Sequence, residues 1–149
     1  MRAVVQRVLS ARVEVEGEVV GRIERGLVAF VGAAEGDTQA DLDYTVGKVV
    51  GLRVFQDERG RMMRALAEVG GGLLVISQFT VFGDVRRGLR PSFDGAMEPV
   101  AAEALYDRFV AAARATGVTV QTGRFRADMR VHVENDGPVT ILIDSRRTF

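Results

Sequence analysis

The sequence predicts one mixed α/β domain in which a largely antiparallel, barrel-like β-sheet packs against two helices. Three observations support this fold class. Valine-rich runs with alternating charged residues open the chain, two segments carry apolar residues at helical spacing, and several glycines precede short apolar runs. A chain of 149 residues is long enough for one such core, so we expect a single domain over residues 1–149.

The first third of the chain is expected to form three strands. Apolar and polar side chains alternate over residues 4–15, as in a strand with one buried face. Gly17 is expected to turn the chain into a second strand over residues 19–23. The continuous apolar run at residues 27–31 suits a strand that is buried on both faces.

The middle third is expected to hold a helix and two strands. The segment Gly36-Asp37-Thr38 offers a helix N-cap, and apolar residues recur at helical spacing up to Val50. Residues 52–56 have the pattern of a short strand, and residues 57–60 that of a turn. The apolar run at residues 73–76, which follows three glycines, predicts a fully buried strand.

The last third is expected to hold the second helix and three strands. Pro99 stands at a favoured first-turn position, and Gly117 suits the C-terminal end. The apolar stripe expected on this helix comprises Val100, Leu105, Phe109 and Ala112. Strands are then expected over residues 118–121, 130–133 and 139–143.

The composition disfavours several kinds of chemistry. The net charge is zero at pH 7, so any RNA contact needs a local basic patch. The chain has no cysteine and one histidine, which disfavours disulfides, thiolate catalysis, a histidine metal site and a Ser-His-Asp triad. We expect that histidine, His132, to be structural. We also expect no metal, no cofactor, no membrane contact and a cytoplasmic location.

The first candidate site is Ser77-Gln78-Phe79-Thr80, at the end of the expected buried strand. Polar groups in such a place must be paired or functional, because burying them without partners costs free energy. The segment is therefore either a strand end with satisfied hydroxyls or a strand-end active site. The residues themselves leave both interpretations open.

The second candidate is the polar segment at residues 82–94, which is expected to be a long loop. Arg86, Arg87 and Arg90 lie on it among glycine and proline residues, and they suit contacts with the phosphates of RNA. Phe93 suits stacking on a base, although an isolated aromatic residue also serves packing.

The third candidate is Asn135-Asp136-Gly137-Pro138-Val139-Thr140, which lies between two expected strands. At an X-Pro bond the cis form costs only about 0.5–1 kcal/mol. The segment is either a plain hairpin turn or a rigid presentation of main-chain atoms, and the segment alone favours the hairpin turn. Met129, a few residues upstream, suits core or pocket lining.

Together these segments resemble one family, the D-aminoacyl-tRNA deacylases. Ser77-Gln78-Phe79-Thr80 matches the SQFT motif of that family, and residues 135–140 match its NxGPVT motif. Residues 1–8, 90–93, 123–125 and 127–129 are also similar, so the resemblance covers essentially the whole chain. Phe82-Gly83-Asp84 and Leu89 depart from the family pattern without touching either motif.

The resemblance implies a homodimeric hydrolase that cleaves the ester between a D-amino acid and the 3′-terminal adenosine of tRNA, and that also acts on mischarged glycyl-tRNA. It implies that Gly137 and Pro138 of one subunit, joined by a cis peptide bond, enter the active site of the other and reject L-amino acids with fixed main-chain oxygens. Asn135 then braces this chiral gate, Arg7 holds the Gly-Pro segment, and Met129 belongs to the substrate-binding set.

For the hydrolytic step, the resemblance makes Thr80 a candidate nucleophile, with Ser77 and Gln78 as polar supports. No general base is close in sequence, and an unactivated threonine is a poor nucleophile. We therefore favour attack by water, assisted by the 2′-hydroxyl of the terminal ribose. Main-chain N–H groups near Phe79 and Thr80 would stabilise the oxyanion.

Two other functions stay open. One is a non-catalytic RNA-binding dimer that uses Arg86, Arg87 and Arg90, and the other is a small-molecule esterase with Thr80 as nucleophile. Binding alone does not require polar groups at the end of a buried strand or a Gly-Pro at a constrained turn. An esterase should show an activated nucleophile, and the sequence shows none.

Overall fold

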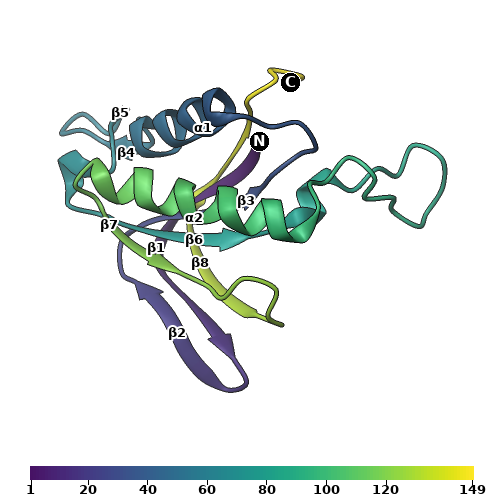
Figure 1. Cartoon of the computed structure of the whole chain (residues 1–149). Coiled ribbons are helices and arrows are strands. Elements are labelled where there is room, and N and C mark those ends of the chain that lie inside the picture. Colours follow the sequence, from purple (N-terminus) through teal and green to yellow (C-terminus); the bar gives the residue numbers. More distant parts are fainter.

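The computed structural model describes residues 1–149 and contains a six-stranded sheet with two helices packed over it (Figure 1). The strands of this sheet are β1 (Arg2–Val15), β2 (Glu18–Ile23), β3 (Gly26–Gly32), β6 (Gly72–Ser77), β7 (Thr119–Thr122) and β8 (Arg130–Asp144). The helices are α1 (Gln39–Gly51) and α2 (Pro99–Ala115). A hairpin of β4 (Phe55–Gln56) and β5 (Met62–Arg64) and the 3-10 turns η1 (Ala67–Val69) and η2 (Phe79–Phe82) complete the elements.

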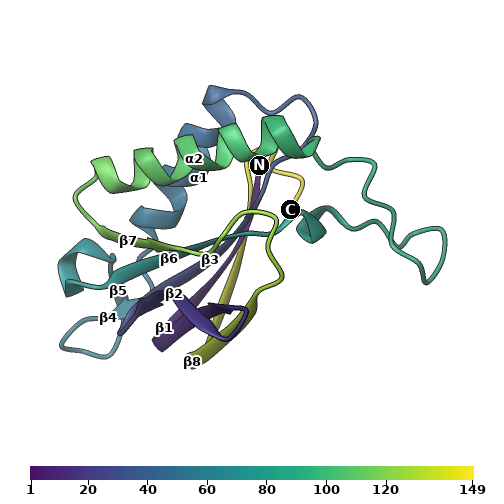
Figure 2. The same cartoon turned by 60° about the horizontal axis from the view of Figure 1, so that its bottom comes forward.

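The sheet curls because the long strand β1 is shared by three partners. Residues 2–8 pair with β3 and residues 11–15 with β2, while β8 also pairs along β1. β1 is antiparallel to all three, whereas β6 is parallel to both β3 and β7. Gly21 of β2 lies so close to β7 that a Cβ would come within 2.3 Å of the Thr122 carbonyl oxygen. The predicted barrel-like, largely antiparallel sheet is confirmed (Figure 2).

Both helices lie on the same side of the sheet and form the main core with it (Figure 1). Leu42 and Val49 of α1 and Phe109 of α2 are fully buried in one cluster with Leu27 and Leu73 of the sheet. Burial of a side chain of this size contributes about 1.5–3 kcal/mol. None of the helices is both long enough and apolar enough to cross a membrane.

The helix starts follow the sequence signals, but one face of α2 differs from expectation. The main-chain N–H of Thr38 donates to Asp41 Oδ2 at 2.8 Å, which completes a capping box at α1. α2 begins at Pro99 as predicted. The stripe predicted on α2 was wrong at Val100, which is 74% exposed. Val100 lies two and a half turns before Phe109, so the two side chains point to opposite faces of the helix.

The two C-terminal strands that the sequence predicts are one continuous strand, β8. Both of its halves run antiparallel to β1 in the same direction. Val8 pairs with Asn135 and Gln6 pairs with Thr140, so residues 136–139 form a bulge opposite Arg7. The hairpin interpretation is therefore wrong, because the Gly-Pro segment interrupts the β1–β8 ladder without reversing the chain.

Residues 83–95 form an arm that projects from one end of the molecule (Figures 1 and 2). Two main-chain hydrogen bonds between Asp84 and Ser92, of 2.8 and 2.9 Å, close its base. Leu89 near its tip is fully exposed. The predicted long loop is confirmed, and its base stands next to η2.

Candidate functional site

A cavity of about 940 Å³ opens where β6 ends. Its walls come from the end of β3, from the segment that leads from β6 into η2, from the base of the arm with the start of α2, and from the loop between β7 and β8. Most of the lining is hydrophobic, and Ser77, Gln78 and Thr80 bring polar groups together on one wall. A mostly apolar cavity with a few converging polar groups is typical of a ligand-binding site.

The polar wall is held by hydrogen bonds at Gln78. Its main-chain N–H donates to the Val31 carbonyl at 2.8 Å, which ties the turn to β3. Its side-chain amide donates to Thr80 Oγ1 at 2.5 Å. Ser77 and Gln78 are half-buried, whereas Thr80 is exposed. The Thr80 hydroxyl therefore accepts a hydrogen bond from an amide, and no hydrogen bond joins it to a group that could take its proton.

Two residues behind η2 fix its position. A Cβ on Gly32 would lie 2.5 Å from Val81 Cγ2 and 2.7 Å from the Gln78 carbonyl oxygen, so only glycine allows η2 to approach β3 this closely. Arg2 donates from Nη1 to the Val81 carbonyl at 3.3 Å, and its guanidinium lies 4.8 Å from the centre of the Phe82 ring. The SQFT segment is thus held from both sides at the edge of the cavity.

Aromatic and sulfur-containing side chains border the polar wall. Phe79 is 58% exposed and meets Phe93 edge-on, with ring centroids 5.0 Å apart and an interplanar angle of 71°. Met129 lines the same cavity, close enough to Gly123 that a Cβ there would lie 2.6 Å from its sulfur. The structure therefore brings six predicted residues into one cavity: Ser77, Gln78, Phe79, Thr80, Phe93 and Met129.

The bulge at residues 136–139 is braced from two sides. The Val139 N–H donates to Asn135 Oδ1 at 2.8 Å, and Asn135 Nδ2 donates to the Val139 carbonyl at 3.1 Å. Arg7, which is buried, donates from Nε to the Asp136 carbonyl at 3.0 Å and pairs with the Asp136 carboxylate at 3.3 Å. The Gly137–Pro138 bond is cis, as predicted, and both residues are exposed.

The bulge and the cavity are separate surfaces within one chain. None of Gly137, Pro138, Asn135 and Arg7 lines the cavity that contains the SQFT segment. The four predicted gate residues form their own cluster between β1 and β8. One chain alone therefore does not bring the two sequence motifs together.

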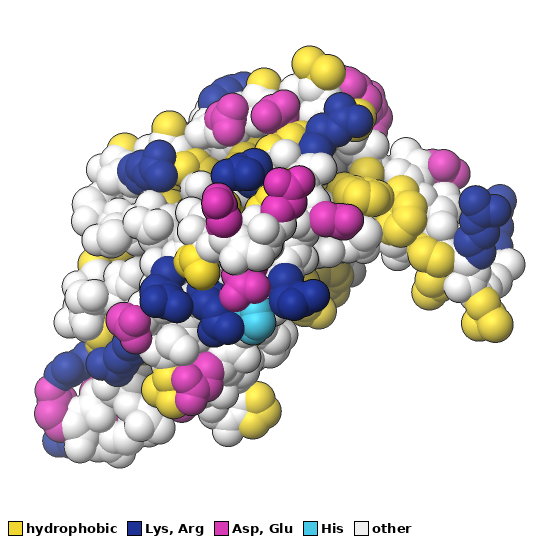
Figure 3. All heavy atoms as spheres, turned by 90° about the horizontal axis from the view of Figure 1, so that it is seen from below, with side chains coloured by type: hydrophobic (Ala, Val, Ile, Leu, Met, Phe, Trp, Pro, Cys, Tyr) yellow, Lys and Arg dark blue, Asp and Glu magenta, His cyan; other side chains and the backbone are white.

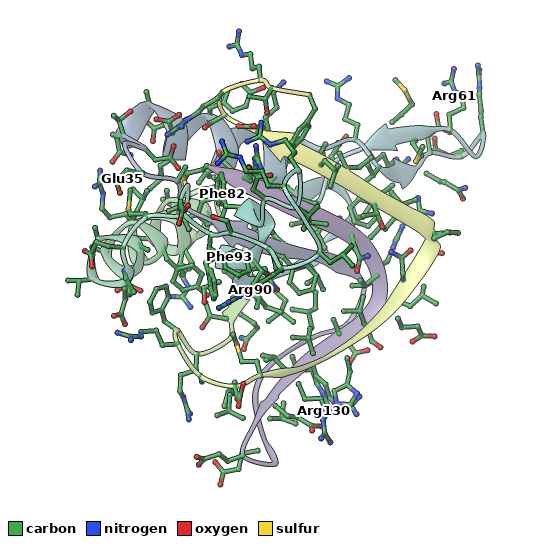
Figure 4. All side chains as sticks on the ribbon, turned by 90° about the vertical axis from the view of Figure 1, so that its right-hand side faces the viewer. Glu35, Arg61, Phe82, Arg90, Phe93 and Arg130 are labelled. Atoms are coloured by element: carbon green, nitrogen blue, oxygen red, sulfur yellow. The ribbon has the colours of Figure 1, made fainter.

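The three arginines of the arm are not equivalent. The Nη2 atom of Arg86 lies 2.5 Å from Asp84 Oδ2, and hydrogen bonds from this guanidinium lower the pKa of the Asp84 carboxyl to about 2. Arg87 and Arg90 are exposed. In Figure 4 the arm points toward the viewer, and Arg90 and Phe93 lie near the centre of this end of the molecule. The arginines lie outside the cavity lining.

His132 lies outside the cavity, among charged side chains on the outer face of β1 and β8 (Figure 3). Its Nδ1 is 3.3 Å from Arg12 Nη2, and its Nε2 is 3.4 Å from Glu14 Oε1. The hydrogen bond from Arg12 is the main cause that keeps the pKa of Glu14 below its usual value. This position fits the structural role predicted for the histidine.

Three residues of the cavity carry no functional signal in the sequence. Tyr106 of α2 donates its hydroxyl to the Val75 carbonyl at 2.9 Å, and burial raises its pKa. Phe125 packs on Tyr106 with ring centroids 5.8 Å apart. Arg126 has a φ of 61° and is the only Lys or Arg in the lining. Helical spacing from Phe109 could have placed Tyr106 on the buried stripe, but no sequence signal marks a left-handed backbone at an arginine.

A family model described as D-Tyr-tRNA(Tyr) deacylase matches residues 4–144. A D-aminoacyl-tRNA deacylase of Sorangium cellulosum is 78% identical, with 100% of each chain covered, and one of Symbiobacterium thermophilum is 58% identical, with 100% of this chain and 99% of that protein covered. The solved structure of a c-Myc DNA Unwinding Element Binding Protein has a TM-score of 0.92 at 40% identity, and covers 97% of this chain and 98% of its own. A probable eukaryotic D-amino acid tRNA deacylase shares the fold, with a TM-score of 0.83 at 20% identity and coverage of 96% and 98%.

Proposed function

The chain belongs to the D-Tyr-tRNA(Tyr) deacylase family, and from this premise we propose that it hydrolyses the ester between a D-amino acid and the 3′-terminal adenosine of tRNA. The products are free tRNA and the D-amino acid. The observation that carries the proposal is the 78% identity, along the full chain, to a protein named D-aminoacyl-tRNA deacylase. A cytoplasmic location, where charged tRNA is used, belongs to the same proposal.

The hydrolytic step uses water as the nucleophile. Water attacks the ester carbonyl carbon, the bond to the ribose oxygen breaks, and that oxygen takes up a proton. The neighbouring 2′-hydroxyl of the ribose assists the attack, and the main-chain N–H groups of Phe79 and Thr80 stabilise the negative charge on the carbonyl oxygen. The hydrogen bonding of Thr80 supports this assignment, because its hydroxyl accepts from Gln78 and is not hydrogen-bonded to a base.

The active form is a homodimer in which the bulge of one subunit enters the cavity of the other. The bulge is exposed, braced by Asn135 and Arg7, and outside the cavity of its own chain. A second chain is therefore needed to place Gly137 and Pro138 against the SQFT segment. This arrangement makes the bulge a component of the partner's substrate site.

Main-chain atoms at the bulge select the D isomer by steric exclusion. The D and L isomers differ in the direction in which the side chain leaves Cα. A wall of fixed main-chain atoms blocks the L side chain whatever its type, and leaves the D side chain free. Glycine has no side chain to block, so mischarged glycyl-tRNA is a second substrate.

The RNA is held by the arm and its base. Arg87 and Arg90 are free to bind phosphates, whereas Arg86 is already paired with Asp84. Phe93, together with Phe79, offers an aromatic surface for a base at the opening of the cavity. Because phosphates carry no sequence information, these contacts suit many tRNAs.

Release of D-tyrosine from D-tyrosyl-tRNA tests the activity, and we expect hydrolysis without an added cofactor. A substrate that ends in 2′-deoxyadenosine tests the ribose assistance, and we expect its turnover to fall by at least about 100-fold. Unchanged turnover of the 2′-deoxy substrate would favour Thr80 as the nucleophile. Binding of the tRNA without any hydrolysis would instead favour the non-catalytic RNA-binding dimer.

A further inference from the structure

We propose that Arg126 binds a phosphodiester of the last two nucleotides of the tRNA and holds the 3′ end at the rim of the cavity. This inference rests on the proposed function, because it requires an RNA 3′ end in the cavity. It adds a second phosphate contact to those of the arm, on the loop between β7 and β8 that lines the cavity.

Arg126 is the cationic side chain that the cavity offers to an anion. It is exposed, and it is the only Lys or Arg among the lining residues. Two acidic residues share the lining, but both carboxylate oxygens of Glu98 accept main-chain N–H groups at the start of α2, at 3.1 and 2.7 Å. Asp128 is exposed, and neither Asp128 nor Arg126 takes part in an ion pair. The guanidinium is therefore available to an anionic ligand.

The backbone of Arg126 has a conformation that favours glycine. Its φ of 61° lies in the left-handed region, where the Cβ of an L residue crowds the following carbonyl. Such positions persist where the surrounding structure fixes them, and they gather at functional sites. Glycine would adopt this backbone conformation without strain, so the conformation does not account for an arginine at this position. The arginine side chain therefore requires another explanation.

The loop that carries Arg126 is tied to the strand that carries the SQFT segment. Phe125 packs on Tyr106, and the Tyr106 hydroxyl donates to the Val75 carbonyl of β6. The Gly123 N–H donates to the same carbonyl at 3.1 Å. Two independent contacts therefore fix the loop relative to the end of β6. Figures 1 and 2 show the loop between β7 and β8 at the end of the molecule from which the arm projects.

The chemistry of the substrate places a phosphate near this rim. When the ester of the terminal adenosine lies at the SQFT segment, the phosphodiester on the 5′ side of that nucleotide points away from the ester toward the opening. A guanidinium binds a phosphate through two parallel hydrogen bonds, so an arginine on the rim is suited to hold it. Arg87 and Arg90, on the arm, meet phosphates farther along the RNA.

The test compares a substrate with phosphates and a substrate without them. D-tyrosyl-tRNA has a phosphodiester at the rim, whereas 3′-O-(D-tyrosyl)adenosine has none. Arg126→Gln removes the charge and keeps the size of the side chain. Arg124→Gln is the matched control, because Arg124 is exposed on the same loop but does not line the cavity. Arg126→Gly is a second variant, expected to fold because its φ suits glycine.

Both Arg126 variants should lower kcat/KM for D-tyrosyl-tRNA by about tenfold through KM, and leave kcat/KM for 3′-O-(D-tyrosyl)adenosine within about twofold. The negative slope of log(kcat/KM) against log salt concentration should become shallower by about 0.7, the value for one phosphate contact on a single strand. Arg124→Gln should change neither value.

Unchanged kinetics of Arg126→Gln on the tRNA would overturn the inference, and so would an equal loss on both substrates. An equal loss in Arg124→Gln would also overturn it, because the effect would then be one of net charge. In all three cases the wild-type protein still hydrolyses 3′-O-(D-tyrosyl)adenosine and the proposed function stands. A wild-type protein that hydrolyses neither substrate would refute the proposed function itself.

Discussion

Replacing Asn135 with alanine should loosen the bulge without unfolding the sheet. The substitution removes the two hydrogen bonds with Val139, of 2.8 and 3.1 Å, and a longer one to Thr140 Oγ1 at 3.4 Å. A hydrogen bond of this kind contributes about 0.5–1.5 kcal/mol, so the two short bonds stabilise the closed bulge by about 1–3 kcal/mol. A loss of about 1.4 kcal/mol lowers the equilibrium constant for forming the hydrogen-bonded bulge tenfold. The β1–β8 pairs on both sides of the bulge remain, so Tm should fall by only a few degrees.

Hydrogen exchange at the Val139 amide is the direct assay, because that N–H donates to the Asn135 side chain. In Asn135→Ala its protection should fall by about tenfold, and the discrimination against L-tyrosyl-tRNA should fall by a similar factor. Gln6→Ala is the matched control, since it removes one bond of 3.1 Å to Thr140 beside the bulge and leaves the bulge closed. Unchanged protection at Val139 in Asn135→Ala, or loss of selectivity in Gln6→Ala, would refute the reasoning.

Three further predictions concern other parts of the protein. Gly137→Ala places a Cβ 3.2 Å from Arg7 Nη2 at a φ of 139°, so deacylation of D-tyrosyl-tRNA should fall by more than about tenfold, with unchanged far-UV circular dichroism; wild-type activity would contradict this. Thr80→Val should reduce kcat by less than about tenfold if water attacks, whereas a loss beyond about 1000-fold would assign the nucleophile to Thr80. The hydrogen bond from the Thr38 N–H is the main cause that lowers the pKa of Asp41 from 3.8 to about 2. The resulting stability is present above pH 4 and is lost as the pH falls toward 2. The free energy of unfolding in urea should therefore fall between pH 6 and pH 2.5 by about 1 kcal/mol less in Asp41→Asn than in the wild type, after allowance for solvent screening. An equal fall in both proteins would contradict the assignment.

Elements with a strong local signal were predictable from the sequence. The apolar run after three glycines became the buried strand β6, and Pro99 marked the start of α2. The continuity of β8 was not predictable, because Asp136, Gly137 and Pro138 favour a turn in any short window. Whether the chain reverses there depends on pairing with β1, at the other end of the sequence, and that pairing keeps the direction unchanged.

The candidate site, like the fold, was predictable from the sequence only in part. The SQFT segment was placed correctly at the end of a buried strand, because apolar residues give way abruptly to polar ones there. A rigid main-chain segment at residues 135–140 was one of two interpretations that the sequence allowed, and its separation from the cavity depends on tertiary structure. The pairing of Arg86 with Asp84 and the left-handed backbone of Arg126 are conformational facts that residue types alone do not encode.

The ratio of kcat/KM for D-tyrosyl-tRNA to that for L-tyrosyl-tRNA tests the central claim most directly. If the exposed main-chain atoms of Gly137 and Pro138 exclude the L side chain from the partner's cavity, the ratio should be at least about 100. A ratio near one, measured on protein that hydrolyses the D substrate, would contradict the chiral filter.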